Sequence, residues 1–336
     1  MTNISFLERR STYALRGIAI LMIIVSHTYN GYPIDNPSFY FPEILNYLQM
    51  GYWGGMGVGI FLFLSGYGLF LSLDKRIGID WRYVSSKIKR LFEPFLIYWV
   101  VEIIVLAIFN QCELTLHLLE EFVTFSIHPD TENWFFKVIV IVYMITIGLF
   151  KCSLKNSIRI AILFILSFTY LLVMRGTGLG QWWYNTILCF PVGALVAYRY
   201  NFFSSLNPVI VSLTSFGLLL GLFFVHMNTI FLHLCFVILC IYIIPLFKQL
   251  KFSGGFWNKQ NRLLYYIGYN SFIFYFIECP IMDEVMMFCY NIYPLYCVLS
   301  VIGTFILSFV CVECSNFISY KVWGNKSSYF QHTQGR

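Results

Sequence analysis

The sequence predicts an all-α fold, a bundle of helices that cross a lipid bilayer. Of the 336 residues, 59% are hydrophobic and 11% are charged, whereas soluble domains carry about 25% charged residues. The mean hydropathy is +0.72. The apolar residues also gather into runs of about 20, the length that a helix needs to cross a bilayer. We therefore expect a polytopic membrane protein that forms a single domain over residues 1–336.

Ten apolar segments follow one another along the chain, and each is expected to form a transmembrane helix. They lie near residues 12–31, 56–73, 92–110, 134–150, 157–175, 182–200, 206–226, 229–247, 263–281 and 295–319. The second segment is rich in glycine, which favours close approach between helices. In the sixth segment, Pro191 is expected to produce a kink. A short polar tail, 321–336, ends the chain.

Basic and acidic residues alternate from one predicted loop to the next. Arg9 precedes the first segment, Arg76 follows the second and Lys151 follows the fourth, while most acidic residues fall in the intervening loops. Because basic loops stay in the cytoplasm, both termini are predicted to be cytoplasmic. The net charge of +6 is spread from loop to loop, so it does not indicate nucleic-acid binding.

Two polar residues, Arg16 and His27, lie at the ends of the apolar stretch RGIAILMIIVSH. Eleven residues make about three helical turns, so both side chains share one helix face, about 16 Å apart along the axis. An arginine at the bilayer centre costs on the order of 2.5–3.5 kcal/mol. One interpretation is a polar cavity inside the bundle. The alternative is that Arg16 reaches the inner headgroups while His27 lies at the outer interface. The shared face favours the cavity.

Three carboxylates fall within predicted membrane segments, and we expect them to face the bundle interior. They are Glu102, Glu278 and Glu313. For Glu102 and Glu313, a structural ion pair is a better explanation than catalysis. Judged on such features alone, an exporter or transporter of a small anion or of a lipid-linked sugar is the leading interpretation, because cavity-lining charges and broken helices are typical of transporters.

Six stretches of the chain carry a family resemblance, in the order in which that family has them. They are YALRGIAILMIIVSH, GVGIFLFLSGYGLF, KIKRLFEPFLIYW, WFFKVIVIVYMI, WWYNTILCFPVGALVA and IGYNSFIFYFIECP. Together they resemble acyltransferase family 3, bacterial membrane enzymes that O-acylate surface sugars. The first stretch carries the family's Arg and His, separated by ten residues. The resemblance covers nearly the whole chain.

This resemblance implies an O-acetyltransferase of the bacterial inner membrane. Its donor would be cytoplasmic acetyl-coenzyme A, used as a co-substrate, with no permanently bound cofactor and no metal. Its acceptor would be a hydroxyl of an extracytoplasmic glycan, such as capsule, O-antigen, exopolysaccharide or another cell-wall polysaccharide. The expected partners are therefore the acyl donor, the glycan and the lipid bilayer.

The resemblance also implies roles for individual residues. His27 would act as general base or carry the acyl group transiently, and Arg16 would hold the donor or stabilise developing charge. Lys87 and Arg90 occupy the place of the family's Arg-x-x-Arg and would bind donor phosphates, although positive-inside topology alone also explains them. Glu278 stands where the family often has His. The further pocket candidates are Ser65, Gly66, Trp134, Arg175, Ser271, Tyr275 and Glu278 itself.

Overall fold

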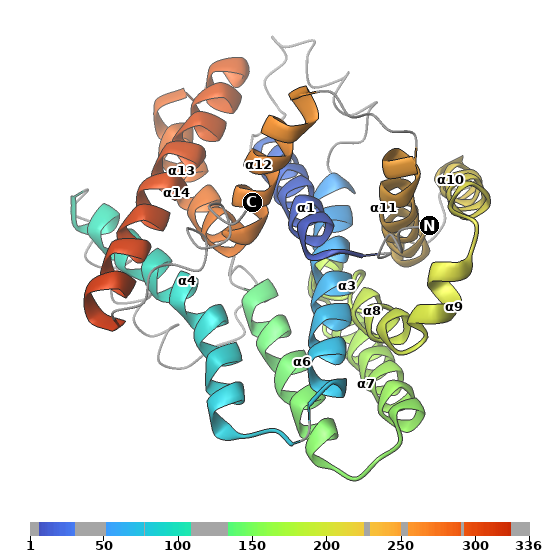
Figure 1. Ribbon diagram of the computed structural model, residues 1–336. Helices are drawn as coiled ribbons and strands as arrows, with labels where there is room; N and C mark the ends of the chain where they lie inside the picture. The colour runs from blue at the N-terminus through green and yellow to red at the C-terminus, as the bar shows by residue number, and fades with distance from the viewer. Residues whose placement is uncertain are drawn as a thin grey trace.

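The computed structural model describes residues 7–30, 52–76, 78–108, 134–224, 229–249, 255–289 and 292–323, and these residues form helices joined by turns, without strands (Figure 1). This confirms the predicted all-α class. The helices are α1 (Arg9–Asn30), α3 (Trp53–Asp74), α4 (Trp81–Ile108), α6 (Trp134–Lys151), α7 (Asn156–Gly176), η2 (Gln181–Trp183), α8 (Cys189–Tyr198), α9 (Tyr200–Ser205), α10 (Pro208–Phe224), α11 (Thr229–Gln249), α12 (Gly255–Tyr269), α13 (Ser271–Cys289) and α14 (Tyr293–Trp323).

Five of the described helices are long and apolar enough to cross a membrane. They are α1, α3, α6, α7 and the Tyr293–Phe317 part of α14. Shorter apolar helices cover Cys189–Tyr198, Pro208–Leu222 and Thr229–Ile243. Each of the ten predicted segments overlaps a described helix, whereas ten crossings and cytoplasmic termini stay predictions.

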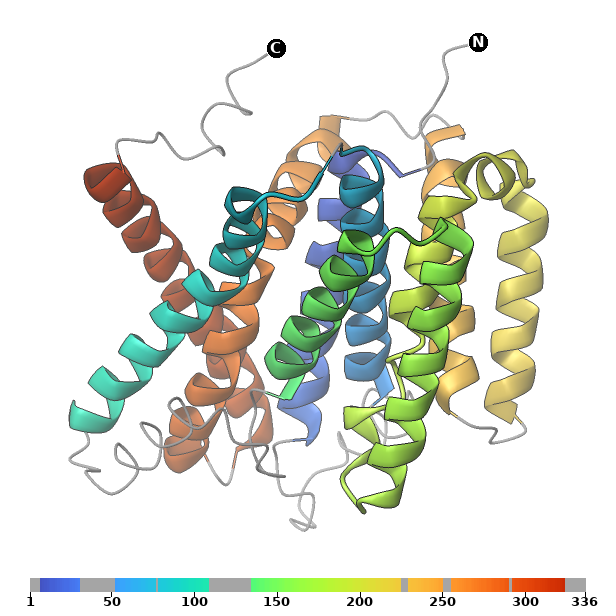
Figure 2. The same ribbon diagram turned by 90° about the horizontal axis from the view of Figure 1, so that it is seen from below.

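One end of the bundle gathers the basic residues that the sequence placed in cytoplasmic loops. At this end α1, α4 and α7 begin and α3, α6 and α14 end (Figure 2). We call it the basic end; among the described residues it carries Arg9, Arg76, Arg82, Lys151 and Lys155. The arrangement agrees with the alternation of charge from loop to loop.

The segment predicted at 182–200 does not form one long helix. The chain makes the 3₁₀ turn η2 and further turns before α8 begins at Cys189. Pro191 is the third residue of α8, within the first turn, where its missing N–H removes no intrahelical hydrogen bond. The predicted kink is therefore wrong, because the proline lies at the start of the helix.

The segment predicted at 263–281 is also two helices, α12 and α13, which meet at Asn270. The side-chain amide of Asn270 donates to the carbonyl oxygen of Tyr266 at 3.0 Å. The carbonyl oxygen of Asn270 accepts from the backbone N–H of Ile273 at 2.9 Å, which starts α13. Asparagine competes with helical hydrogen bonds in this way, so one helix ends and the next begins here.

The core is centred on α3, which packs against α1, α6, α8 and α11. Glycines bring α3 and α8 together, because a Cβ on Gly66 would lie 2.0 Å from the carbonyl oxygen of Phe190. A Cβ on Gly193 would likewise lie 2.0 Å from the carbonyl oxygen of Phe63. The close helix approach expected from the glycine-rich segment is therefore present.

Exposed apolar side chains cover the outside of the bundle, as lipid contact requires. Examples are Ile165 on α7, Leu213 on α10 and Ile306 on α14, each more than 60% exposed. Glu313 is also exposed on α14, so its expected interior position is wrong. Its neighbour Val312 packs towards α13, which turns the glutamate outward. The Glu102 side chain lies outside the described part of the chain.

Candidate active site

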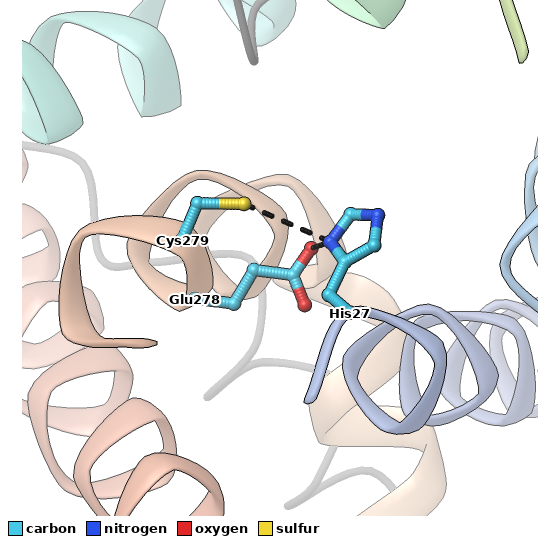
Figure 3. A group of neighbouring side chains, drawn as sticks. All are labelled: His27, Glu278 and Cys279. Atoms are coloured by element: carbon cyan, nitrogen blue, oxygen red, sulfur yellow. Dashed lines mark hydrogen bonds and ion pairs between the residues drawn. The ribbon is translucent and has the colours of Figure 1, made fainter. Parts of the chain in front are cut away.

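A histidine of α1 meets two side chains of α13 near the end of the bundle that is opposite the basic end. His27 Nδ1 lies 3.0 Å from Oε1 of Glu278 and 3.7 Å from Sγ of Cys279. Figure 3 shows the carboxylate and the thiol approaching the same ring nitrogen, while Nε2 points away from both. His27 thus has a defined partner on another helix, and one nitrogen directed elsewhere.

Glu278 is fully buried, whereas the side chain of His27 is 35% exposed. A buried carboxylate is costly unless a positive charge or hydrogen bonds compensate for it. The imidazole of His27 supplies that compensation at ion-pair distance. Both carboxylate oxygens are buried, and neither has a hydrogen-bond partner among the described residues, so the contact with Nδ1 is an ion pair. The pair therefore combines a ring nitrogen at ion-pair distance with two buried carboxylate oxygens that make no hydrogen bond in the described part of the chain.

The ligand atoms of His27, Glu278 and Cys279 lie within 4.8 Å of one another, so this group could hold a metal ion. Nitrogen, carboxylate and thiolate are ligands that Zn²⁺ accepts. A separation of 3.0 Å between Nδ1 and Oε1 is also short enough for the carboxylate to attract a proton on Nδ1 electrostatically. We interpret the group as a proton-binding pair with a neighbouring thiol.

The predicted site residues of α13 follow one another along one side of that helix. Ser271, Tyr275 and Glu278 are all buried, and their spacing of four and three residues places them on one face. The ring of Tyr275 lies 5.5 Å from that of Phe135 on α6. This face of α13 is therefore directed into the bundle.

Four other predicted pocket residues lie elsewhere. Ser65 is buried in α3 and Gly66 faces the backbone of α8, so Gly66 serves helix packing. Trp134 packs against Trp183, with ring centres 5.8 Å apart. Arg175 is exposed in the last turn of α7. The described contacts link none of these four to His27.

A second cluster of charge lies at the basic end, around Lys87 in α4. Burial, together with the charges of the nearby arginines Arg90, Arg76 and Arg16, lowers the pKa of Lys87 to about 8. We call Arg16, Arg76, Lys87 and Arg90 the basic cluster. Within the described part of the chain, no carboxylate lies at ion-pair distance from these four. Such a group of uncompensated cations is suited to a multiply charged anion.

Arg16 belongs to the basic cluster and does not pair with Glu278. Its Nε is buried and has no hydrogen-bond partner in the described part of the chain. Its guanidinium carbon lies 5.7 Å from the ring centre of Tyr13. Arg16 and His27 thus have different partners along α1, and a cavity that joins them stays a prediction.

A family model described as an acyltransferase domain matches residues 13–313. The chain belongs to acyltransferase family 3. The match extends from α1 into α14, and so includes the basic cluster and the His27–Glu278 pair. Comparison with curated proteins and comparison with solved structures each gives no match. Family membership favours an acyltransferase over the transporter interpretation.

Within this acyltransferase, sequence reasoning missed two contributors to the clusters. Cys279 lies directly after Glu278, but in the sequence it is one of several cysteines within apolar runs, where a small packing residue is the simplest interpretation. Arg76 follows the second segment in the basic loop DKRIG, where positive-inside topology explains it. Cys279 comes beside His27 only because α13 contacts α1. Arg76 comes near Lys87 only because the end of α3 lies beside the start of α4.

Proposed function

We propose that this protein transfers an acetyl group from cytoplasmic acetyl-coenzyme A to a hydroxyl of an extracytoplasmic glycan. We place it in the bacterial inner membrane, with the basic end towards the cytoplasm. The observation that carries this proposal is the pairing of His27 with the buried carboxylate of Glu278 at 3.0 Å, inside an acyltransferase domain.

The pair suits general base catalysis. Glu278 holds a proton on Nδ1, which leaves Nε2 as the nitrogen that accepts a proton. As Nε2 takes the proton from the acceptor hydroxyl, the hydroxyl oxygen attacks the thioester carbonyl. The tetrahedral intermediate then expels the coenzyme A thiolate, which recovers the proton from the imidazolium. A base of this kind contributes about 10²–10⁴-fold to the rate. The alternative is that His27 carries the acetyl group on nitrogen before it passes to the hydroxyl.

The basic cluster suits the donor. Its four cations can bind the phosphates of coenzyme A by charge-assisted hydrogen bonds. Arg16 lies in this cluster, and His27 lies eleven residues further along the same helix, about 16 Å away along the axis. An extended pantetheine arm directed along α1 would bring the thioester towards His27. The acceptor would then approach from the opposite end of the bundle.

The proposal is tested on the surface glycans of cells with and without this gene. We expect that cells lacking the gene lose one acetyl mass per modified sugar, together with the proton signal of the acetyl ester. The wild-type gene should restore both, and His27→Ala should not, although the variant still reaches the membrane. Unchanged glycan acetylation in cells without the gene would contradict the proposal.

A further inference from the structure

We propose that three tyrosines at the basic end form a platform for the adenine ring of the donor. They are Tyr13 of α1 and Tyr265 and Tyr269 of α12. This inference rests on the proposed function, because it assigns one part of the donor to one surface of the protein. The phosphates remain assigned to the basic cluster.

The three rings form one contact group. The ring centre of Tyr13 lies 5.0 Å from that of Tyr265 and 5.4 Å from that of Tyr269. The rings of Tyr265 and Tyr269 are nearly parallel, with an angle of 15° between their planes. All three side chains are half-buried. The group therefore combines fixed ring positions with side chains that are partly exposed.

Glycine contacts fix this group in place. A Cβ on Gly268 would lie 1.8 Å from the carbonyl oxygen of Tyr13, and a Cβ on Gly17 would lie 2.3 Å from that of Leu264. The backbones of α1 and α12 thus touch beside the tyrosines, and the two helices lie side by side in Figure 1. An aromatic platform held by such packing loses little conformational entropy when a ligand binds.

Two arginines lie next to the platform, on the side where the donor phosphates would bind. Arg9 lies 5.8 Å and Arg16 lies 5.7 Å from the ring centre of Tyr13. Arg16 also acts electrostatically on Lys87, so it connects the platform to the basic cluster. An adenine ring stacked on the tyrosines would therefore place its attached phosphates next to four cations. Aromatic packing between interfacial helices accounts for the rings, but it does not account for this continuity with an uncompensated cationic cluster.

The test compares two donors with the purified full-length protein. Acetyl-coenzyme A carries adenine, whereas acetyl-4′-phosphopantetheine has the same thioester arm and a phosphate but no adenine. We expect the double variant Tyr265→Leu/Tyr269→Leu to raise the KM for acetyl-coenzyme A roughly five-fold or more, the scale of a lost stacking contact. The KM for acetyl-4′-phosphopantetheine should not change. Lys87→Gln should raise the KM for both donors.

Two control variants separate stacking from folding. Tyr265→Phe/Tyr269→Phe keeps both rings and should keep the wild-type KM for acetyl-coenzyme A. Tyr198→Ala removes another half-buried tyrosine, whose ring centre lies 5.1 Å from the guanidinium carbon of Arg199. This variant should leave the KM for both donors unchanged. An equal rise for both donors in the leucine variant, or no rise for either, would overturn the inference.

Direct binding of coenzyme A to the same variants distinguishes this inference from the proposed function. A wild-type protein that binds coenzyme A through the tyrosines but consumes no acyl donor would contradict the proposed function and support the platform. A wild-type protein that uses both donors with the same KM would support the proposed function and contradict the platform.

Discussion

Glu278 gives His27 a buried carboxyl partner on another helix. The carboxylate is fully buried and lies 3.0 Å from Nδ1, so its negative charge favours a proton on that nitrogen and stabilises the imidazolium. In the family resemblance this position often holds His, and a second imidazole could not supply the negative charge that an ionised carboxylate offers to Nδ1. Under the proposed function, a histidine is the reacting group and a carboxylate orients it.

Replacing Glu278 with Gln tests this role of the carboxylate. The amide keeps the shape but loses the charge, and it can present its NH₂ group to Nδ1, which favours the wrong tautomer. We expect coenzyme A release from acetyl-coenzyme A to fall about 10²-fold or more, while the protein remains folded in detergent. Asp283→Asn, the same acid-to-amide change at an exposed carboxylate of α13, is the matched control and should stay near wild-type activity. Near wild-type activity of Glu278→Gln would show that the pair is only structural.

The proposed role of Lys87 in binding the donor predicts that donor binding depends on pH. Its pKa is lowered to about 8, so the ammonium is charged below that pH and loses its proton above it. The KM for acetyl-coenzyme A should therefore rise between pH 7 and pH 9. Lys87→Arg should remove this rise, because a guanidinium stays charged throughout. The same pH profile of KM in both proteins would contradict a role for Lys87 in binding the donor.

At the scale of helices, apolar length predicted where the elements lie, and local hydrogen bonding decided where they break. The ranges 134–150 and 157–175 nearly coincide with α6 and α7, because uninterrupted apolar runs leave few alternatives. Asn270 ends α12 through its contact with Tyr266, and no apolar pattern reveals that contact. The late start of α8 has the same origin, since the turns before it are formed by backbone hydrogen bonds between close neighbours.

The sequence predicted only the part of the candidate site that lies on a single helix. Arg16 and His27 share α1, so their spacing was sufficient to place them on one face. Which residue faces each of them depends on how α1 packs, and periodicity does not contain that information. Glu278 is 251 positions from His27 in the sequence, and the structure brings them together through α13.

The glycine contact between α3 and α8 allows a direct test of helix packing. Gly66→Ala would place a Cβ against the carbonyl oxygen of Phe190, and overpacking of this kind costs about 1–3 kcal/mol. Gly68→Ala is the matched control two residues away, because its Cβ would meet nothing within 4 Å. Thermal unfolding in detergent should show a lower midpoint for Gly66→Ala alone. Equal midpoints for both variants would contradict the close α3–α8 contact.

At the scale of the whole molecule, the proposed function assigns donor binding and acetyl transfer to charged groups at opposite ends of the bundle. The basic cluster lies at the basic end and the His27–Glu278 pair lies towards the other end. A donor made in the cytoplasm and an acceptor outside the cell need this separation, provided that the basic end faces the cytoplasm. The account therefore depends on the orientation of the chain in the membrane.

Cys152 reports this orientation. It is exposed at the basic end, directly after α6. A membrane-impermeant maleimide should label it in inverted membrane vesicles and not in intact cells, and Cys152→Ser should remove that label. Labelling of Cys152 from outside intact cells would reverse the predicted topology and separate the basic cluster from its donor.

The most direct measurement is acyl-donor consumption by the purified protein and by its His27→Ala variant. We expect the wild-type protein to release coenzyme A from acetyl-coenzyme A when a glycan acceptor is present. The folded variant, with unchanged binding of coenzyme A at the basic cluster, should release almost none. Full release of coenzyme A by His27→Ala would contradict the claim that the imidazole beside Glu278 performs the transfer.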